Sequence, residues 1–152
     1  GDGLLFINTG GPPGGSQLWA IREDSLAGDV TDTHVVWRMT DDAPHQSSPV
    51  LVDDLLYAVS DRGILICMEA ATGAEVWRQH LKGKFGASLL AAPGRIYISN
   101  TAGTTTVFAP GREYRELAVN QLDGEHWASP AVTGDALLLR TKTHLYRIEK
   151  KD

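Results

Sequence analysis

The sequence has 152 residues, a length that suits a single domain with a hydrophobic core of its own. Hydrophobic residues make up 42% and charged residues 22%, which is the composition of a folded chain rather than of a disordered one. With a net charge of -5 and no cluster of basic residues, we expect no nucleic-acid partner. The apolar runs are much shorter than the roughly 18 residues of a membrane-spanning helix, so we expect no transmembrane segment.

The single cysteine, Cys67, excludes a disulfide within the chain and a zinc site made of cysteines. The sequence begins at Gly1, without a methionine or a charged and then apolar leader. We therefore expect the chain to be either processed or part of a longer protein.

A repeat of about forty residues runs along the sequence. The run from Ser48 to Val52 recurs from Ser88 to Ala92 and from Ser129 to Thr133, at offsets of 40 and 41 residues. Other positions keep the offset of 40 as well: Trp37 and Trp77, Tyr57 and Tyr97, and Gly63 and Gly103. A period shared by independent residue types indicates a repeat architecture.

Each unit is predicted to hold short strands separated by turns. In the best preserved unit, strands are expected over residues 48–52, 55–60, 64–69 and 74–81, with turns at 53–54, 61–63 and 72–73. Four antiparallel strands within about forty residues are typical of one blade of a β-propeller. The sequence therefore predicts an all-β fold, without a helix of useful length.

The units fall at about residues 1–46, 47–86, 87–127 and 128–152 and are expected to form one partial propeller domain. Gly3 to Thr9 corresponds to the second strand of a blade, so we expect the first blade to lack its innermost strand. Tyr146 to Glu149 corresponds to a third strand, so we expect the last blade to lack its outermost one. The expected count is three, four, four and three strands, or about three and a half blades.

The segment from Cys67 to Trp77 resembles the tryptophan-docking motif of pyrroloquinoline-quinone-type (PQQ-like) propellers, Ala-x-Asp-x-x-x-Gly-x-x-x-Trp. Cys67 stands in the place of the alanine and Glu69 in that of the aspartate, while Gly73 and Trp77 match the motif. The resemblance implies that Trp77, like Trp37 in the preceding unit, docks one blade against the next.

The motif is weaker in the other units. The first unit keeps Ala20 and Trp37 but separates them by seven more residues than the second unit does. The third unit carries Ala109 in the acidic place and Leu117 in the place of the tryptophan.

The PQQ-like family includes BamB-like outer-membrane protein assembly factors and PQQ-dependent alcohol dehydrogenases, which are rings of seven or eight blades. The resemblance implies that this chain is the C-terminal half of such a ring. It also implies a bacterial protein outside the cytoplasm, whether periplasmic, outer-membrane-associated or secreted. In those rings an N-terminal strand usually closes the last blade. The implied blade-docking residues are Trp37, Trp77, Gly73 and Glu69.

In a propeller, the loop before each innermost strand lies at the mouth of the central channel. At offsets of 40 and 41 residues, His45 is equivalent to Phe85 and His126, and Gln46 is equivalent to Gly86 and Trp127. Imidazole and indole rings around one opening can stack on and hydrogen-bond a planar or peptide ligand. The predicted binding residues are therefore His45, Gln46, Phe85, His126 and Trp127. In the alternative, these residues only cap inner strands and pack on their neighbours.

Two other candidate sites have simpler alternatives. Asp41 and Asp42, with His45 and Gln46, could bind a hard cation such as calcium, or they could form an ordinary acidic turn. Cys67 fills a place that the family gives to a small residue, so we expect a buried thiol rather than a nucleophile.

Two further features are expected to be structural. Ser48, Ser88 and Ser129 recur because the blade repeats, so we expect them to satisfy backbone groups between blades. The segment from Gly10 to Gly15 has the composition of a phosphate loop, but no helix is predicted after it. We expect a hairpin insertion there.

Two functions from different classes are open. The first is a non-catalytic scaffold that binds a protein or peptide through the channel-mouth loops, as the resemblance to outer-membrane protein assembly factors implies. The second is a fragment of a PQQ- and calcium-dependent dehydrogenase, although such dehydrogenases carry a pair of adjacent cysteines and this chain has one cysteine. We favour the first, with no catalytic residue, no cofactor and no metal. We also expect self-association through exposed blade faces, or association with the rest of the ring.

Overall fold

The computed structural model describes residues 3–11 and 15–149. These residues form four antiparallel sheets in which consecutive strands lie side by side. Sheet 1 consists of β1 (Leu4–Asn8), β2 (Leu18–Arg22) and β3 (Val35–Met39). Sheet 2 consists of β4 (Val50–Val52), β5 (Leu55–Val59), β6 (Ile64–Glu69) and β7 (Glu75–His80). Sheet 3 consists of β8 (Leu90–Ala92), β9 (Arg95–Ser99), β10 (Thr104–Ala109) and β11 (Arg115–Gln121). Sheet 4 consists of β12 (Ala131–Thr133), β13 (Ala136–Arg140) and β14 (Leu145–Ile148).

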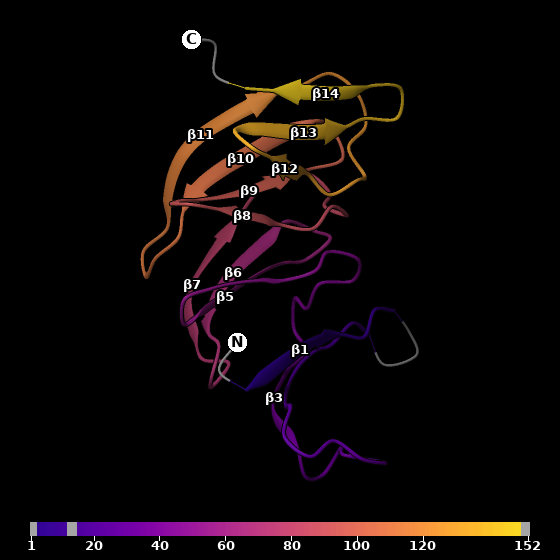
Figure 1. Cartoon of the computed structure of the whole chain (residues 1–152), viewed down its shortest axis with the longest axis vertical. Helices are drawn as coiled ribbons and strands as arrows, with labels where there is room; N and C mark the ends of the chain where they lie inside the picture. Colours follow the sequence, from indigo (N-terminus) through magenta and orange to yellow (C-terminus); the bar gives the residue numbers. More distant parts are fainter. Residues whose placement is uncertain (1–2, 12–14, 150–152) are drawn as a thin grey trace.

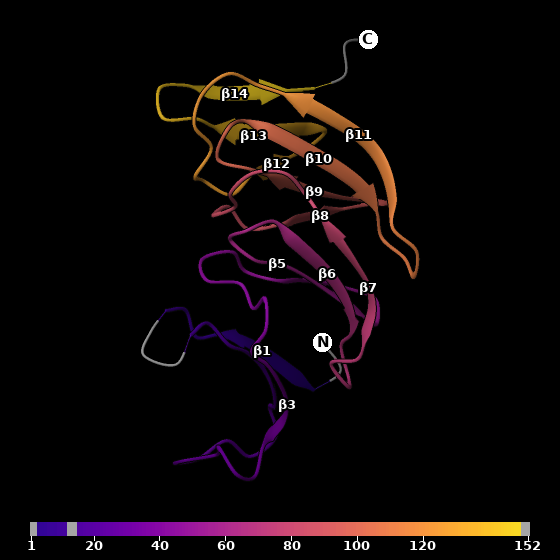
Figure 2. The same cartoon turned by 180° about the vertical axis from the view of Figure 1, so that it is seen from behind.

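The sheets are stacked along the long axis of the molecule, from sheet 1 at the N-terminal end to sheet 4 at the C-terminal end (Figure 1). The outermost strands β7 and β11 run along the same side of the stack in both views (Figure 2). Each sheet is one blade, and the strand counts of three, four, four and three agree with the prediction. The predicted all-β architecture of propeller blades is confirmed. Within the described residues, no helix is long and apolar enough to cross a bilayer.

Sheet 2 is buried on both faces because it lies between two other sheets. Every residue of β5 is buried, and alternate side chains point to opposite faces. Leu56 packs in a cluster shared with Leu18 of sheet 1. Tyr57 packs in a cluster shared with Ile96 of sheet 3. Burial on both faces explains why the sequence of β5 is a continuous apolar run rather than an alternating one.

The repeated serines link successive sheets. Ser48, Ser88 and Ser129 each precede the innermost strand of their sheet. The backbone N–H of Ser48 donates to Oγ of Ser88 at 2.9 Å, and the backbone N–H of Ser88 donates to Oγ of Ser129 at 3.0 Å. The expectation that these hydroxyls satisfy backbone groups of a neighbouring blade is confirmed for Ser88 and Ser129.

The strand register places Ala118, rather than Leu117, at the tryptophan position of sheet 3. Trp77 pairs with Cys67 in sheet 2. Val107, which lies 40 residues after Cys67, pairs with Ala118 in sheet 3. The predicted position was wrong by one residue because the loop closed by the pair Phe108–Glu116 is one residue longer than the loop closed by the equivalent pair Met68–Glu75. Both sheets have a β-bulge next to this pair, and the bulge of sheet 3 skips Leu117.

The glycine-rich segment from Gly10 to Gly15 connects β1 to β2, which pair in antiparallel orientation. This is the connection that a hairpin insertion requires. Residues 12–14 of the segment lie outside the described residues.

Candidate functional site

The loops before the innermost strands are held at one end of the sheets. The backbone N–H of Phe85 donates to the carbonyl oxygen of Asp61 at 3.0 Å, and that of His126 donates to the carbonyl oxygen of Thr101 at 3.3 Å. Asp61 and Thr101 lie in the turns between the second and third strands of sheets 2 and 3. Each loop is therefore fixed by a turn of the preceding sheet.

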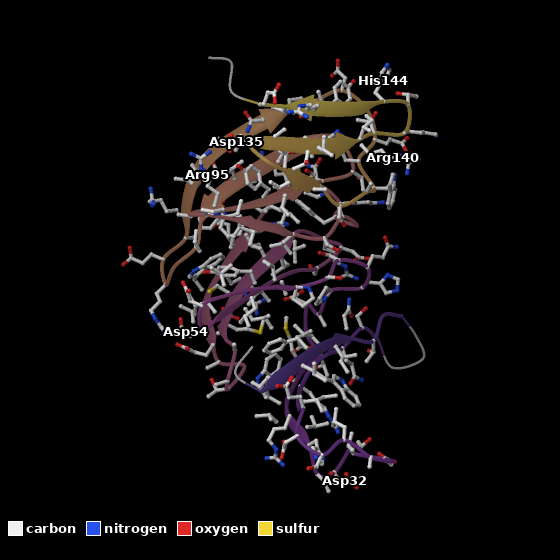
Figure 3. All side chains as sticks on the ribbon, in the orientation of Figure 1. Asp32, Asp54, Arg95, Asp135, Arg140 and His144 are labelled. Atoms are coloured by element: carbon white, nitrogen blue, oxygen red, sulfur yellow. The ribbon has the colours of Figure 1, made fainter. Side chains whose placement is uncertain are left out.

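Figure 3 shows this mouth end in sheet 4, where Arg140 and His144 flank the turn from β13 to β14. Asp54 and Asp135, in the turns between the first and second strands, and Arg95, the first residue of β9, lie at the opposite end (Figure 3). The mouth end and the opposite end are thus built from different sets of turns.

His45 is exposed at the mouth end and is held by Asp61. Its backbone N–H donates to Oδ1 of Asp61 at 3.3 Å, and its ring Nδ1 lies 3.2 Å from Oδ2. When the imidazole is protonated, this contact is an ion pair between two partly exposed side chains. Sequence reasoning missed Asp61 as a site residue because it identified residues 61–63 only as a turn.

Gln46 and Trp127 both lie beside Gly86, the equivalent position of the second unit. A Cβ atom on Gly86 would lie 2.9 Å from Oε1 of Gln46 and 3.1 Å from Cε3 of Trp127. The indole of Trp127 is 56% exposed, and its Nε1 donates to Oε2 of Glu125 at 3.3 Å. An amide, a carboxylate and an exposed indole therefore lie close together. We refer to His45, Gln46, Glu125 and Trp127 as the mouth patch.

Phe85 and His126, the other predicted binding residues, lie beneath the surface. Phe85 is part of the core cluster between sheets 2 and 3. His126 is buried, and its Nε2 has no hydrogen-bond partner. Burial lowers the pKa of His126, so its imidazole is neutral at neutral pH. Direct contact with a ligand therefore stays a prediction for the exposed residues His45, Gln46 and Trp127.

Hollows adjoin the mouth patch on both sides. One of about 650 Å³ extends along β1 and is lined by His45 and Gln46 together with Pro49 and Leu51. A second, of about 330 Å³, is lined by Glu125, Trp127, Arg140, Thr141 and Lys142 among others. The arrangement combines apolar surface with donors and acceptors of both charges, which suits a peptide better than a single small anion or cation.

Trp37 and Trp77 each bond to the sheet that follows their own. Nε1 of Trp37 donates to the carbonyl oxygen of Ala70 in sheet 2 at 2.9 Å. Nε1 of Trp77 donates to the carbonyl oxygen of Gly111 in sheet 3, also at 2.9 Å. The ring of Trp77 lies 5.9 Å from that of Tyr57, between centroids.

Gly73 lies directly against the ring of Trp37. A Cβ atom on Gly73 would be 2.8 Å from Cδ2 of that indole, closer than real side chains approach. Glu69 forms an ion pair with Arg112, which belongs to the connection after β10 and also reaches Asp54 at 2.5 Å. All of these contacts join one sheet to its neighbour.

Two further candidate residues from the sequence are Cys67, which is buried, and Asp42, which forms an ion pair. Cys67 is fully buried, and burial raises the pKa of its thiol to about 11. Asp42 pairs with Arg78 at 2.6 Å. In the part of the chain that the structure describes, no group of three or more His, Cys, Asp or Glu side chains comes together in a way that could hold a metal ion.

The family model described as outer membrane protein assembly factor BamB matches residues 11–146. No curated protein matches the chain in sequence. The crystal structure of BamB from Moraxella catarrhalis has a TM-score of 0.71 at 16% identity, over 97% of this chain and 43% of that chain. A chain of a mitotic checkpoint complex has a TM-score of 0.73 at 14% identity, over 97% of this chain and 49% of that one. A europium-containing methanol dehydrogenase has a TM-score of 0.57 at 13% identity, over 80% of this chain and 23% of that one.

At these identities the solved structures show a shared fold. The chain spans less than half the length of each of these three structures. The family model covers most of the chain, and the matched residues include strands of all four sheets. The chain therefore belongs to the family of the outer membrane protein assembly factor BamB, with its PQQ-like repeat.

Proposed function

We propose that this chain is part of a non-catalytic scaffold that binds an extended segment of another protein at the mouth patch. The observation that carries the proposal is the exposed indole of Trp127, which lies over Gly86 beside the amide of Gln46. Exposed aromatic side chains surrounded by polar groups are the usual anchors of protein interfaces.

The loops that carry the mouth patch are fixed before any partner binds. Loop residues Phe85 and His126 are bonded through their backbone N–H groups to the turns of the preceding sheets. His45 is bonded to Asp61 through both its backbone and its ring. A preformed surface loses little conformational entropy on binding, which favours affinity for a flexible segment.

The family supports a proposal about the location and the class of partner. Its model is named for outer membrane protein assembly. We propose a role of this kind for the chain, outside the cytoplasm of a bacterium, with a protein partner and without a bound cofactor.

The test is selection from a displayed library of random peptides, followed by calorimetric titration of the selected peptide. The expected result is that Trp127→Ala weakens binding by about tenfold or more, the usual effect of truncating an interface anchor. Val119→Ala is the control, because Val119 is apolar and exposed to a similar extent, 54%, but lies on β11 of sheet 3. Selected peptides that bind Trp127→Ala and the parent equally would refute the proposal.

The end faces of the stack are proposed to contact other blades. Leu5, Ile7 and Val36 are exposed on sheet 1. An apolar sheet face of this kind favours association. We propose that this face is covered by the rest of the ring or by a second copy of the chain. Native mass spectrometry of the chain would detect a second copy as a dimer.

The dehydrogenase alternative rests on the fold shared with a europium-containing methanol dehydrogenase. Native mass spectrometry with excess PQQ and calcium distinguishes the two functions. A stoichiometric quinone adduct that requires calcium supports the dehydrogenase, and no added mass supports the scaffold.

A further inference from the structure

The loop that carries Trp127 also carries a buried histidine next to it. This loop, residues 122–130, connects β11 to β12, and we call it the Trp127 loop. The side chain of Trp127 is 56% exposed, whereas that of His126 is 1% exposed. Nε2 of His126 is buried without a hydrogen-bond partner. The mouth patch is therefore attached directly to an unpaired, titratable ring beneath the surface.

The preceding unit fills the equivalent place with an apolar ring. Phe85 lies 41 residues before His126, in the loop of residues 81–89 between β7 and β8. It packs in the core cluster between sheets 2 and 3. Both residues donate their backbone N–H to a turn of the preceding sheet, Phe85 to Asp61 and His126 to Thr101. His126 thus holds an imidazole where the repeat accommodates a phenyl ring.

The imidazole is not in the wall of the hollow beside it. The hollow of about 330 Å³ next to the mouth patch is lined by Glu125, Trp127 and Ala128 of this loop but not by His126. A buried ring that takes up a proton without a partner is destabilised, because its charge is removed from water. Since the hollow does not reach the ring, His126 gains contact with water when the Trp127 loop moves.

Two backbone hydrogen bonds fix the loop at this point. The N–H of His126 donates to the carbonyl oxygen of Thr101 at 3.3 Å, a longer bond than the equivalent one of Phe85 at 3.0 Å. The N–H of Lys142 donates to the carbonyl oxygen of Glu125 at 3.1 Å. Both bonds involve residues next to Trp127 or contiguous with its neighbour, so their loss displaces the indole.

No charged side chain compensates a proton on His126 in the described structure. The turn from β9 to β10, to which His126 is bonded, contains no titratable residue. Burial is what lowers the pKa of His126, with no contribution from a neighbouring charge. The titratable residues of the surrounding elements are Asp123 and Glu125 in the Trp127 loop, Arg140, Lys142 and His144 at the end of β13 and in the turn after it, and Lys82 and Lys84 in the loop before β8.

We propose that the mouth patch is gated by pH: uptake of a proton by His126 draws its ring out of its buried place, opens the Trp127 loop and moves Trp127 away from Gly86. The mouth patch is then assembled at neutral pH and disassembled in acid. The effect on binding rests on the proposed function, whereas the movement of the loop is a property of the chain alone.

The first test therefore needs no partner. Hydrogen exchange followed by NMR gives protection factors, corrected for the intrinsic effect of pH, for the amides of His126 and Lys142. An opening that exposes the imidazole is favoured up to about tenfold more for each pH unit below about 6.5, until the folded pKa is reached. Both protection factors are expected to fall between about pH 7.5 and about pH 5, while that of Phe85 in the equivalent loop changes less. An unchanged value at His126, or an equal fall at Phe85, would overturn the proposal.

Two variants remove the titrating ring. His126→Phe places the ring of the preceding unit in the third unit, and His126→Gln is a second neutral variant should the phenyl ring not fit. In both, the protection factor of the amide at position 126 is expected to be nearly the same at the two pH values. His144→Gln, at an exposed residue, is the control and is expected to keep the fall. A fall that persists in both variants of His126 would assign the effect to another group and refute the gate.

The second test measures the affinity for a peptide selected from the displayed library. Apparent affinity decreases in proportion to the fraction of the chain in its binding-competent conformation. The parent is expected to bind about threefold more weakly or worse at about pH 5 than at about pH 7.5, and His126→Phe nearly equally at both. His45→Gln removes the exposed imidazole of the mouth patch. Whatever its affinity at neutral pH, the ratio between the two pH values is expected to persist.

The two tests separate this inference from the proposed function. If Trp127→Ala binds the peptide as the parent does, the proposed function fails, and hydrogen exchange of the chain alone still decides whether the loop opens. If Trp127 anchors the peptide but the affinity is the same at both pH values, the mouth patch binds without a gate and this inference is wrong.

Discussion

The indole N–H of Trp77 donates to the carbonyl oxygen of Gly111, 2.9 Å away in the next sheet, while the backbone N–H of Gly111 donates to the phenol oxygen of Tyr57 at 2.8 Å. Both side chains come from sheet 2 and both bond to one residue of sheet 3. Two hydrogen bonds at one glycine therefore join two blades that share no strand.

We predict that Trp77→Ala lowers the free energy of unfolding by about 3 kcal/mol, at the low end of the range for aromatic truncation because Trp77 is only partly buried. Urea denaturation measures the loss. Trp77→Phe keeps the ring contacts with Tyr57 but removes the donor to Gly111, so its cost is expected to lie between those of the parent and Trp77→Ala. A Trp77→Ala chain as stable as the parent would exclude a blade-docking role.

We predict that Gly73→Ala destabilises the chain more than Gly94→Ala does. Both glycines have φ +71°, so both substitutions carry the same backbone strain. Only at Gly73 would the new Cβ clash with the ring of Trp37, since nothing lies within 4 Å of the corresponding atom at Gly94. The difference in unfolding free energy is expected to be about 1–3 kcal/mol, the usual cost of overpacking. Equal losses would place Gly73 outside the packing of Trp37.

Ser88→Ala removes the acceptor for the backbone N–H of Ser48. We predict a loss of about 0.5–1.5 kcal/mol, the net value of one hydrogen bond, and more if the N–H is left without water. Ser47→Ala is the control, because Oγ of Ser47 is buried without a hydrogen-bond partner and its removal is expected to be neutral or stabilising. Thermal denaturation of the two variants under identical conditions makes the comparison.

The buried imidazole of His126 makes stability depend on pH. Because burial lowers its pKa in the folded state, the unfolded chain binds a proton more readily than the folded one. Stability is therefore fully present above the unfolded pKa of about 6.5 and is lost as the pH falls through the lower folded value. We predict that His126→Gln reduces this loss, while His144→Gln, at an exposed residue, does not. Urea denaturation at about pH 7.5 and about pH 5 measures it, and parallel losses in both variants would assign the effect to other groups.

The repeat made the blades predictable. Serines, aromatics and glycines kept one offset because the blade repeats. Among them, Trp37, Trp77, Ser88 and Ser129 bond to a neighbouring sheet. Trp77 was recognisable because its neighbours Glu69 and Gly73 stand at fixed distances from it. The position of Ala118 was not, because one extra residue between the paired residues Phe108 and Glu116 shifts the register without a signal in the composition.

The candidate site was predictable as a set of positions but not as a surface. Offsets of 40 and 41 residues identified Gln46, Gly86 and Trp127, and both Gln46 and Trp127 lie beside Gly86. Whether a loop residue points outward depends on the turn beneath it, so burial separates His126 from Trp127 although they are adjacent in sequence. The contact of Asp61 with His45 joins two different connections and has no signal in the spacing.

The central claim is that the mouth patch binds an extended protein segment. Hydrogen exchange of the chain, alone and with a peptide selected from the displayed library, tests it most directly. The expected result is added protection of backbone amides in the loops before β4, β8 and β12, with little change at the opposite end of the sheets. Protection confined to the turns at the opposite end, with the three loops unchanged, would contradict it.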